Sequence, residues 1–235
     1  ALKMIGSEAQ IGIIGGTGGM GSLFARFFRR HGCRVRVASR RTALTPEACA
    51  AWTGDGGLVV ISVPIPDTVA LIRRLAPKLS RGGALMDLTS VKQEPVRAML
   101  AAHRGEVVGC HPVFGPGLGR PTGQVVVLTP ARRGPWLGRF ERMLRAEGAL
   151  VCRSTPREHD RVMAVVQGLI HLTSIQLVET IRRMGIPPAL LRAYSSPVYR
   201  VRFDFAARIL AQDPELYAEI ALRNPASRRV LSTYL

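Results

Sequence analysis

Short apolar runs alternate with longer amphipathic stretches through most of the chain. The runs are rich in β-branched residues and are bounded by glycine, proline and polar residues, a pattern typical of buried strands. They fall at 11–14, 34–38, 58–62, 84–88 and 106–109, with two further strands at 124–128 and 149–152. Helical spacing covers 67–79, 91–103 and 136–147. This alternation predicts an α/β fold, a doubly wound Rossmann-type parallel sheet with helices on both faces.

The periodicity changes after Pro156, where residues 159–184 form one long helical pattern. Its middle, from Met163 to Leu172, is apolar nearly all round, so the helix must be buried on several sides. We therefore expect a sheet domain at residues 1–153 and a small all-α domain at 154–235. The roughly 50 residues that follow the helix are too few to enclose it, which predicts a homodimer built around 162–178.

A glycine-rich turn joins the first predicted strand to the first helix. It reads Gly15-Gly16-Thr17-Gly18-Gly19-Met20-Gly21 and contains the spacing G-x-G-x-x-G. Side chains at these glycines would block the tight bend, the approach of a pyrophosphate and the packing of the helix on the sheet. Backbone N–H groups at the start of the helix can then hold phosphate oxygens. The turn predicts a dinucleotide site that includes Gly16, Thr17, Gly18, Gly19, Met20 and Gly21, with Ser62, Val63 and Pro64 after the third strand.

The residues after the second strand favour NADP over NAD. An acidic residue there would accept hydrogen bonds from the ribose 2′-OH and repel a 2′-phosphate, but this chain has Ser39-Arg40-Arg41. A hydroxyl and two guanidinium groups suit a 2′-phosphate. We expect NADP as the cofactor, with NAD the less favoured alternative.

Composition narrows the class of protein further. With 47% hydrophobic residues the chain can bury a substantial core, and no apolar stretch approaches the roughly 20 residues that span a bilayer. The N-terminal residues lack the pattern of a secretory signal, which predicts a cytoplasmic protein. The four cysteines have no metal-ligand spacing, so we expect reduced residues in or near the core and no metal. They are Cys33, Cys49, Cys110 and Cys152.

The net charge is +17, from 33 basic and 16 acidic residues. The arginines are spread along the chain without interleaved aromatic residues or a nucleic-acid-binding motif. A positive field also attracts small anionic ligands. We expect an anionic small-molecule substrate and neither a nucleic acid nor a membrane as partner.

Candidate chemistry follows the strands at the edge of the sheet where ligands bind. Asp87-Leu88-Thr89-Ser90-Val91-Lys92 follows the fourth strand, and Cys110-His111-Pro112-Val113-Phe114-Gly115-Pro116 follows the fifth. A histidine at this edge is a candidate proton acceptor. On position alone, His111 is equally well interpreted as a loop histidine bonded to backbone.

These motifs together resemble the prephenate/arogenate dehydrogenase family from end to end. Further along the chain the resemblance includes Glu158-His159-Asp160, Gln167-Gly168-Leu169-Ile170-His171, residues 195–200 and residues 208–217. The His-Pro-x-Phe-Gly-Pro loop combined with Arg-x-x-x-Gln-Asp-Pro is specific to that family. We expect no chorismate mutase segment before Ile11 and no regulatory domain after Leu235.

The resemblance implies an oxidative decarboxylation of prephenate or arogenate in tyrosine biosynthesis. His111 then accepts the proton of the 4-hydroxyl group, Ser90 orients that hydroxyl, and Arg208 binds the ring carboxylate. The resemblance also places His171, Arg200 and Tyr217 at the substrate. Two alternatives stay open, since His171 also fits a core histidine and Arg200 fits a structural ion pair.

Three other functions compete with this interpretation. A 4-amino-4-deoxyprephenate dehydrogenase of secondary metabolism would use the same motifs. A deazaflavin:NADP oxidoreductase resembles only the first 42 residues and has no place for His111 or Arg208. A non-catalytic NADP-binding module would not need either residue.

Overall fold

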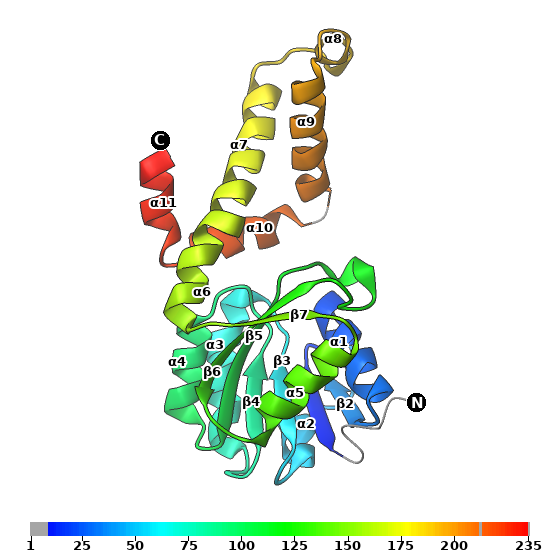
Figure 1. Ribbon diagram of the computed structural model, residues 1–235, viewed down its shortest axis with the longest axis vertical. Helices are drawn as coiled ribbons and strands as arrows, with labels where there is room; N and C mark the ends of the chain where they lie inside the picture. The colour runs from blue at the N-terminus through cyan, green and yellow to red at the C-terminus, as the bar shows by residue number, and fades with distance from the viewer. Residues whose placement is uncertain (1–8, 212, 235) are drawn as a thin grey trace. The chain divides into compact units, whose positions relative to one another are not determined.

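The computed structural model describes residues 9–211 and 213–234 (Figure 1). The chain divides between His159 and Asp160 into two compact units, here called unit 1 and unit 2. Gln212 of the Arg-x-x-x-Gln-Asp-Pro motif lies outside the described residues.

Unit 1 is built on a seven-stranded sheet with the order β2-β1-β3-β4-β5-β6-β7. All five strands expected before residue 110 form, and each begins within one residue of the predicted start. The strands are β1 (Gln10–Ile14), β2 (Arg34–Ala38), β3 (Leu58–Ile61), β4 (Ala84–Asp87), β5 (Glu106–Pro112), β6 (Val125–Arg132) and β7 (Leu150–Arg153). Ile11, Ile13, Val60 and Ile61 are fully buried, as expected for strands covered on both faces.

One strand pair departs from the expected all-parallel sheet. β5 and β6 are antiparallel, with His111 opposite Val127, whereas β6 and β7 are again parallel. The connection between β5 and β6 contains only the short 3-10 turn η2 (Pro116–Leu118). A parallel connection needs a crossover, usually a helix, so this short link returns the chain in the opposite direction.

Helices cover both faces of the sheet (Figure 1). On one face α1 (Gly19–Arg30) and α5 (Pro135–Ala146) pack Phe24, Phe27, Phe28, Trp136 and Phe140 against the strands. The other face is covered by α2 (Pro46–Thr53), α3 (Ile65–Leu75) and α4 (Gln93–Ala102). The 3-10 turn η1 (Ala76–Lys78) extends α3. This arrangement confirms the doubly wound fold.

The cysteines differ in burial. Cys33, Cys49 and Cys110 are buried, whereas Cys152 is exposed. The prediction of a core position for Cys152 was wrong because β7 is one of the two edge strands of the sheet and its residues are largely exposed.

Unit 2 is helical, as predicted. The long helix consists of α6 (Pro156–Met163), which begins in unit 1, the π-helical segment η3 (Ala164–Leu169) and α7 (Ile170–Arg183). Figure 1 shows α7 and α9 side by side, joined through α8. The remaining helices are α8 (Pro188–Ala193), α9 (Pro197–Leu210), α10 (Pro214–Leu222) and α11 (Ser227–Tyr234). Of these, α9 and α10 contact α7, and α10 and α11 contact η3.

The continuous helix Pro156–Arg183 has the length and composition of a membrane span, contrary to the expectation that no stretch reaches that length. This is weak grounds for a membrane protein, because the core helix of a soluble protein has the same properties. The helix carries buried His171, Thr173 and Ser174 and is packed by three other helices of unit 2. It still leaves Val162, Val165 and Val166 between 44% and 51% exposed.

Candidate functional site

The glycine turn is held by close backbone packing. Gly15 has φ +84°, and a Cβ there would lie 2.1 Å from the Ser62 carbonyl oxygen. A Cβ on Gly21 would lie 2.5 Å from the Gly15 carbonyl oxygen, and one on Gly16 would meet Val37 at 2.6 Å. Side chains at these positions would therefore push the helix away from the sheet.

The start of α1 is suited to an anion. Gly18 precedes the helix without a side-chain cap, and the first turn carries no acidic residue. The backbone N–H groups of this turn and the positive end of the helix dipole therefore remain for a phosphate group. Gly19 cannot carry a side chain without moving Pro116, 2.6 Å from the position of a Cβ. Met20 packs against the apolar core on this face.

A cleft of about 810 Å³ opens in front of the turn. Its lining combines the turn with the segments that follow β2 and β3, as expected for a dinucleotide site. Predicted residues in the lining are Thr17, Gly18, Ser39, Arg40, Arg41, Ser62, Val63 and Pro64. Gly16 and Gly21 act instead through the packing just described.

The segment after β2 presents two exposed guanidinium groups to this cleft. The Ser39 N–H donates to Thr42 Oγ1 at 2.8 Å, and the Arg41 N–H donates to Ser39 Oγ at 3.0 Å, which fixes the turn. Arg40 and Arg41 line the cleft from this turn. The sequence did not identify several further lining residues. Two of them are charged, Asp67 and Arg74, and both come from α3, far from the glycine motif.

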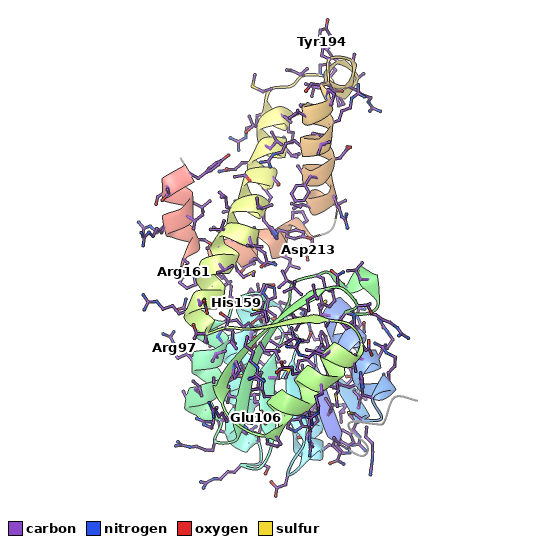
Figure 2. The ribbon with its side chains drawn as sticks, viewed as in Figure 1. Arg97, Glu106, His159, Arg161, Tyr194 and Asp213 are labelled. Carbon is purple, nitrogen blue, oxygen red and sulfur yellow. The ribbon has the colours of Figure 1, made fainter. Side chains whose placement is uncertain are left out.

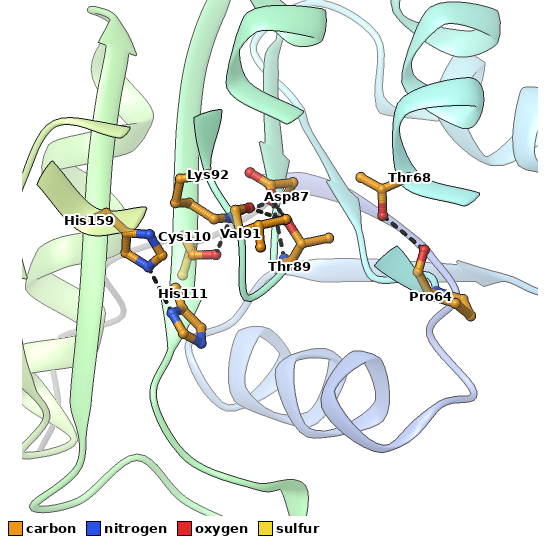
Figure 3. A network of polar contacts seen from close by, with 9 residues as sticks. All are labelled: Pro64, Thr68, Asp87, Thr89, Val91, Lys92, Cys110, His111 and His159. Atoms are coloured by element: carbon orange, nitrogen blue, oxygen red, sulfur yellow. Dashed lines mark hydrogen bonds and ion pairs between the residues drawn. The ribbon is translucent and has the colours of Figure 1, made fainter. Parts of the chain in front are cut away.

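Buried charges connect the ends of β4 and β5 (Figure 3). Asp87 and Lys92 are fully buried and form an ion pair. The Lys92 ammonium also donates to the Cys110 carbonyl oxygen at 2.8 Å, and the Thr89 N–H donates to Asp87 Oδ2 at 3.1 Å. Removing one partner of such a buried pair typically costs about 3–5 kcal/mol. Because Lys92 also bonds to the Cys110 carbonyl, the pair holds the backbone next to His111 in place.

His111 lies near the end of β5 and is only 2% exposed. Its Nδ1 lies 2.8 Å from Nε2 of His159, and the two rings meet edge to face at 68° (Figure 3). Figure 2 shows Glu106, at the start of β5, far from His159 at the other end of unit 1. Burial, and then the nearby His159 and Lys92, lower the pKa of His111 well below 6.5. A neutral imidazole is therefore available as a base at neutral pH.

Ser90 follows Thr89 in the loop after β4 and is half-buried. In this loop, Asp87 accepts hydrogen bonds from Thr89 and Lys92. The expected position of Ser90 beside the substrate hydroxyl stays a prediction.

Three of the predicted substrate residues gather in unit 2. The ring of His171 packs edge-on against Tyr217, with 4.4 Å between the centroids. Burial lowers the pKa of His171 to about 4, and its buried Nδ1 has no hydrogen-bond partner among the described residues. Burial raises the pKa of Tyr217, and the nearby charge of Arg208 opposes that shift. Arg208 itself is exposed at the end of α9.

Arg200 makes a local contact, and its expected position at the substrate stays a prediction. Its Nε donates to Ser195 Oγ at 2.9 Å, and its Nη2 to the Ser195 carbonyl oxygen at 3.4 Å. The guanidinium therefore braces the start of α9, where Ser196 caps the helix.

Comparison with known families covers nearly the whole chain. Residues 24–153 match the nucleotide-binding domain of prephenate dehydrogenase, and residues 155–234 match its dimerization domain. A probable arogenate/prephenate dehydrogenase of Methanocaldococcus jannaschii is 34% identical over 99% of this chain. The T-protein of Haemophilus influenzae is 36% identical over 98% of it. The chain spans 56% and 61% of the lengths of these two relatives.

The fold has solved counterparts. A crystal structure of prephenate dehydrogenase from A. aeolicus, in complex with hydroxyphenyl propionate and NAD+, superposes with a TM-score of 0.74. The match covers 97% of this chain and 87% of that one at 24% sequence identity. At 24% sequence identity, this structural similarity is evidence for the fold alone.

Proposed function

The chain belongs to the prephenate dehydrogenase family, and on that premise we propose that it oxidatively decarboxylates prephenate or arogenate in tyrosine biosynthesis, using NADP. The proposal rests mainly on the environment of His111. It is a buried imidazole with a lowered pKa, in the same unit as the nucleotide cleft. Reduction of NADP in the presence of either substrate tests the proposal.

The residues of the cleft fit a dinucleotide. The uncapped start of α1 at Gly18 would hold the pyrophosphate, and Arg40 and Arg41 would hold a 2′-phosphate. The packed glycines at Gly15 and Gly21 leave no room for side chains between the turn and the helix. When bound, the oxidised nicotinamide accepts the electrons that leave the substrate ring. We assign dinucleotide binding to residues 1–153.

The chain's own residues handle the proton and the charges of the substrate. His111 accepts the proton of the 4-hydroxyl group through Nε2, because Nδ1 is occupied by His159. Ser90 orients that hydroxyl. Arg208 binds the ring carboxylate, since an exposed guanidinium can make two charge-assisted hydrogen bonds to it. The ring becomes aromatic when it loses carbon dioxide together with the hydride on the carbon that bears the hydroxyl, which NADP would accept. The oxygen that gave its proton to His111 becomes the phenol oxygen and takes up a proton again.

Residues 154–235 are assigned to substrate binding and dimerisation. His171 and Tyr217 form a buried aromatic pair close to the charge of Arg208, which suits a ring substrate with carboxylates. Arg200 contributes through the start of α9, which it braces at Ser195. We place the reaction in the cytoplasm, with the long apolar helix serving as the core of unit 2.

Arg40→Ala is expected to raise KM for NADP about tenfold or more and to leave KM for NAD nearly unchanged. A charge-assisted hydrogen bond to phosphate is worth about 1.5–3 kcal/mol, and NAD has no 2′-phosphate. Steady-state kinetics with both nucleotides measures the effect. Arg73→Ala is the matched control, because Arg73 is exposed on α3 outside the lining of the cleft. A kcat/KM for NAD equal to or above that for NADP in the unsubstituted protein would reject the preference.

A homodimer is expected at micromolar protein concentration. Val162, Val165 and Val166 leave an apolar stripe on the long helix, and residues 155–234 match a dimerization domain. Val166→Glu should shift the sedimentation coefficient to that of a monomer, since a charge would be buried at the interface. Leu150→Glu, at an exposed position on β7, is the matched control. A monodisperse monomer before substitution would contradict the prediction.

A further inference from the structure

We propose that His159 is a positioning residue that fixes the tautomer of His111, so that Nδ1 carries the proton and Nε2 presents its lone pair. The inference rests on the proposed function of His111 as the base. It assigns a task to a residue that the sequence marked only as part of Glu158-His159-Asp160.

The two rings are held in place from different elements. His111 lies on β5, where its backbone pairs with Val127 of β6. His159 lies in the first turn of α6, where its N–H donates to the Thr155 carbonyl oxygen at 2.9 Å. Both side chains are 2% exposed, so neither ring is free to turn toward solvent. The 2.8 Å separation of His111 Nδ1 and His159 Nε2 is that of a hydrogen bond.

The direction of this hydrogen bond decides whether His111 can act as a base. Between two neutral imidazoles, one nitrogen donates its proton and the other accepts. If His159 donated, the single proton of His111 would lie on Nε2, which could then accept nothing from a substrate. If His159 accepts, that proton lies on Nδ1 and Nε2 is free. The base role therefore requires His159 to be the acceptor, with its own proton on Nδ1.

A neutral acceptor also suits this position electrostatically. The ionisable groups that act on His111 are His159 from α6 and Lys92 from the segment before α4, with Asp87 of β4 paired to Lys92. A carboxylate in place of His159 would stabilise the imidazolium and raise the pKa of His111. A second imidazole fixes the orientation without adding a negative charge, so His111 stays unprotonated at neutral pH.

The tautomer can be measured directly. In the full chain with ¹⁵N-labelled histidine, long-range ¹⁵N–¹H NMR at neutral pH should show His111 protonated on Nδ1. The chain has five histidines, and the spectrum of His111→Asn assigns the signals. His159→Gln retains an acceptor oxygen and should keep this tautomer, whereas His159→Leu removes the acceptor and should shift the proton to Nε2. Finding His111 protonated on Nε2 in the unsubstituted protein would overturn the inference, even if His159→Leu does not fold.

Kinetics give a second readout. We expect His159→Leu to lower kcat about tenfold to a hundredfold, as is found when a partner that orients a metal-binding histidine is removed. His159→Gln should retain most of the activity, because its side-chain oxygen can still accept the Nδ1–H of His111. His103→Gln, at another buried histidine of unit 1, is the control and should leave kcat unchanged.

The outcomes separate this inference from the proposed function. Equal losses of kcat in His159→Gln and His159→Leu, with an unchanged His111 tautomer, would reduce His159 to a packing residue and reject the inference. An Nδ1–H tautomer in a protein that does not turn over prephenate or arogenate would support the positioning role and reject the proposed function instead.

Discussion

His111→Asn is expected to lower kcat by about two to four orders of magnitude, with little change in the substrate KM. Asparagine keeps a polar side chain of similar size but cannot accept a proton at neutral pH. The loss therefore falls on an interaction made mainly in the transition state. Steady-state kinetics over a range of pH measures it.

The pH dependence of the unsubstituted protein provides an internal check. Burial, His159 and Lys92 lower the pKa of His111, so the imidazole is neutral and active as a base above that pKa. We expect the acidic limb of the kcat/KM profile to lie below pH 6.5. Loss of the base should therefore lower kcat/KM only at pH values below 6.5. His103→Asn is the matched control. A His111→Asn protein with near-normal kcat would refute the base assignment.

Arg208→Gln is expected to raise the substrate KM about tenfold to a hundredfold, equivalent to the ~1.5–3 kcal/mol of a hydrogen bond between charged groups. The expected contact of Arg208 with the ring carboxylate would be made in the ground state and the transition state alike, so kcat should change little. NADP affinity should be unaffected. The measurement is steady-state kinetics together with a thermal unfolding midpoint.

Arg202→Gln is the matched control for this variant, because Arg202 is exposed on the same helix. An unchanged KM with a lower unfolding midpoint in Arg208→Gln would show that Arg208 is structural. The substrate carboxylate would then be bound by another residue.

Much of the sheet could be predicted from the sequence because its strands are buried on both faces. Runs such as residues 58–61 are continuously apolar and bounded by turn residues, so their positions are clear. The glycine turn could also be predicted, because glycines are required where the backbone makes close contacts such as that of Gly15 with Ser62. The long helix could be predicted from its apolar middle segment.

Other elements left weaker signals. Helix α2 was not predicted because Pro46–Thr53 has no strong apolar stripe, although Thr45 caps it and Pro46 occupies its first position. The antiparallel β6 depends on the absence of a helix between β5 and β6, which local periodicity does not reveal. The π-helical turn at Ala164–Leu169 has the same apolar pattern as an α-helix.

The candidate site was predictable where its residues belong to one motif and not where it is assembled from several. His111 and the glycine turn were identified from local patterns. The contact of His111 with His159 joins residues 48 apart, and that of Lys92 with Cys110 joins residues 18 apart. Arg74 reaches the nucleotide cleft from α3. Such long-range pairs depend on the packing of the sheet and are not encoded in any short stretch.

The central claim is tested most directly by following NADPH formation and carbon dioxide release together when the purified full chain is mixed with NADP and prephenate, and in parallel with arogenate or 4-amino-4-deoxyprephenate. We expect NADPH and carbon dioxide in equal amounts with prephenate or arogenate, at a higher kcat/KM than with the 4-amino compound. No turnover of any of the three, with NADP bound normally, would identify a nucleotide-binding module instead and contradict the account.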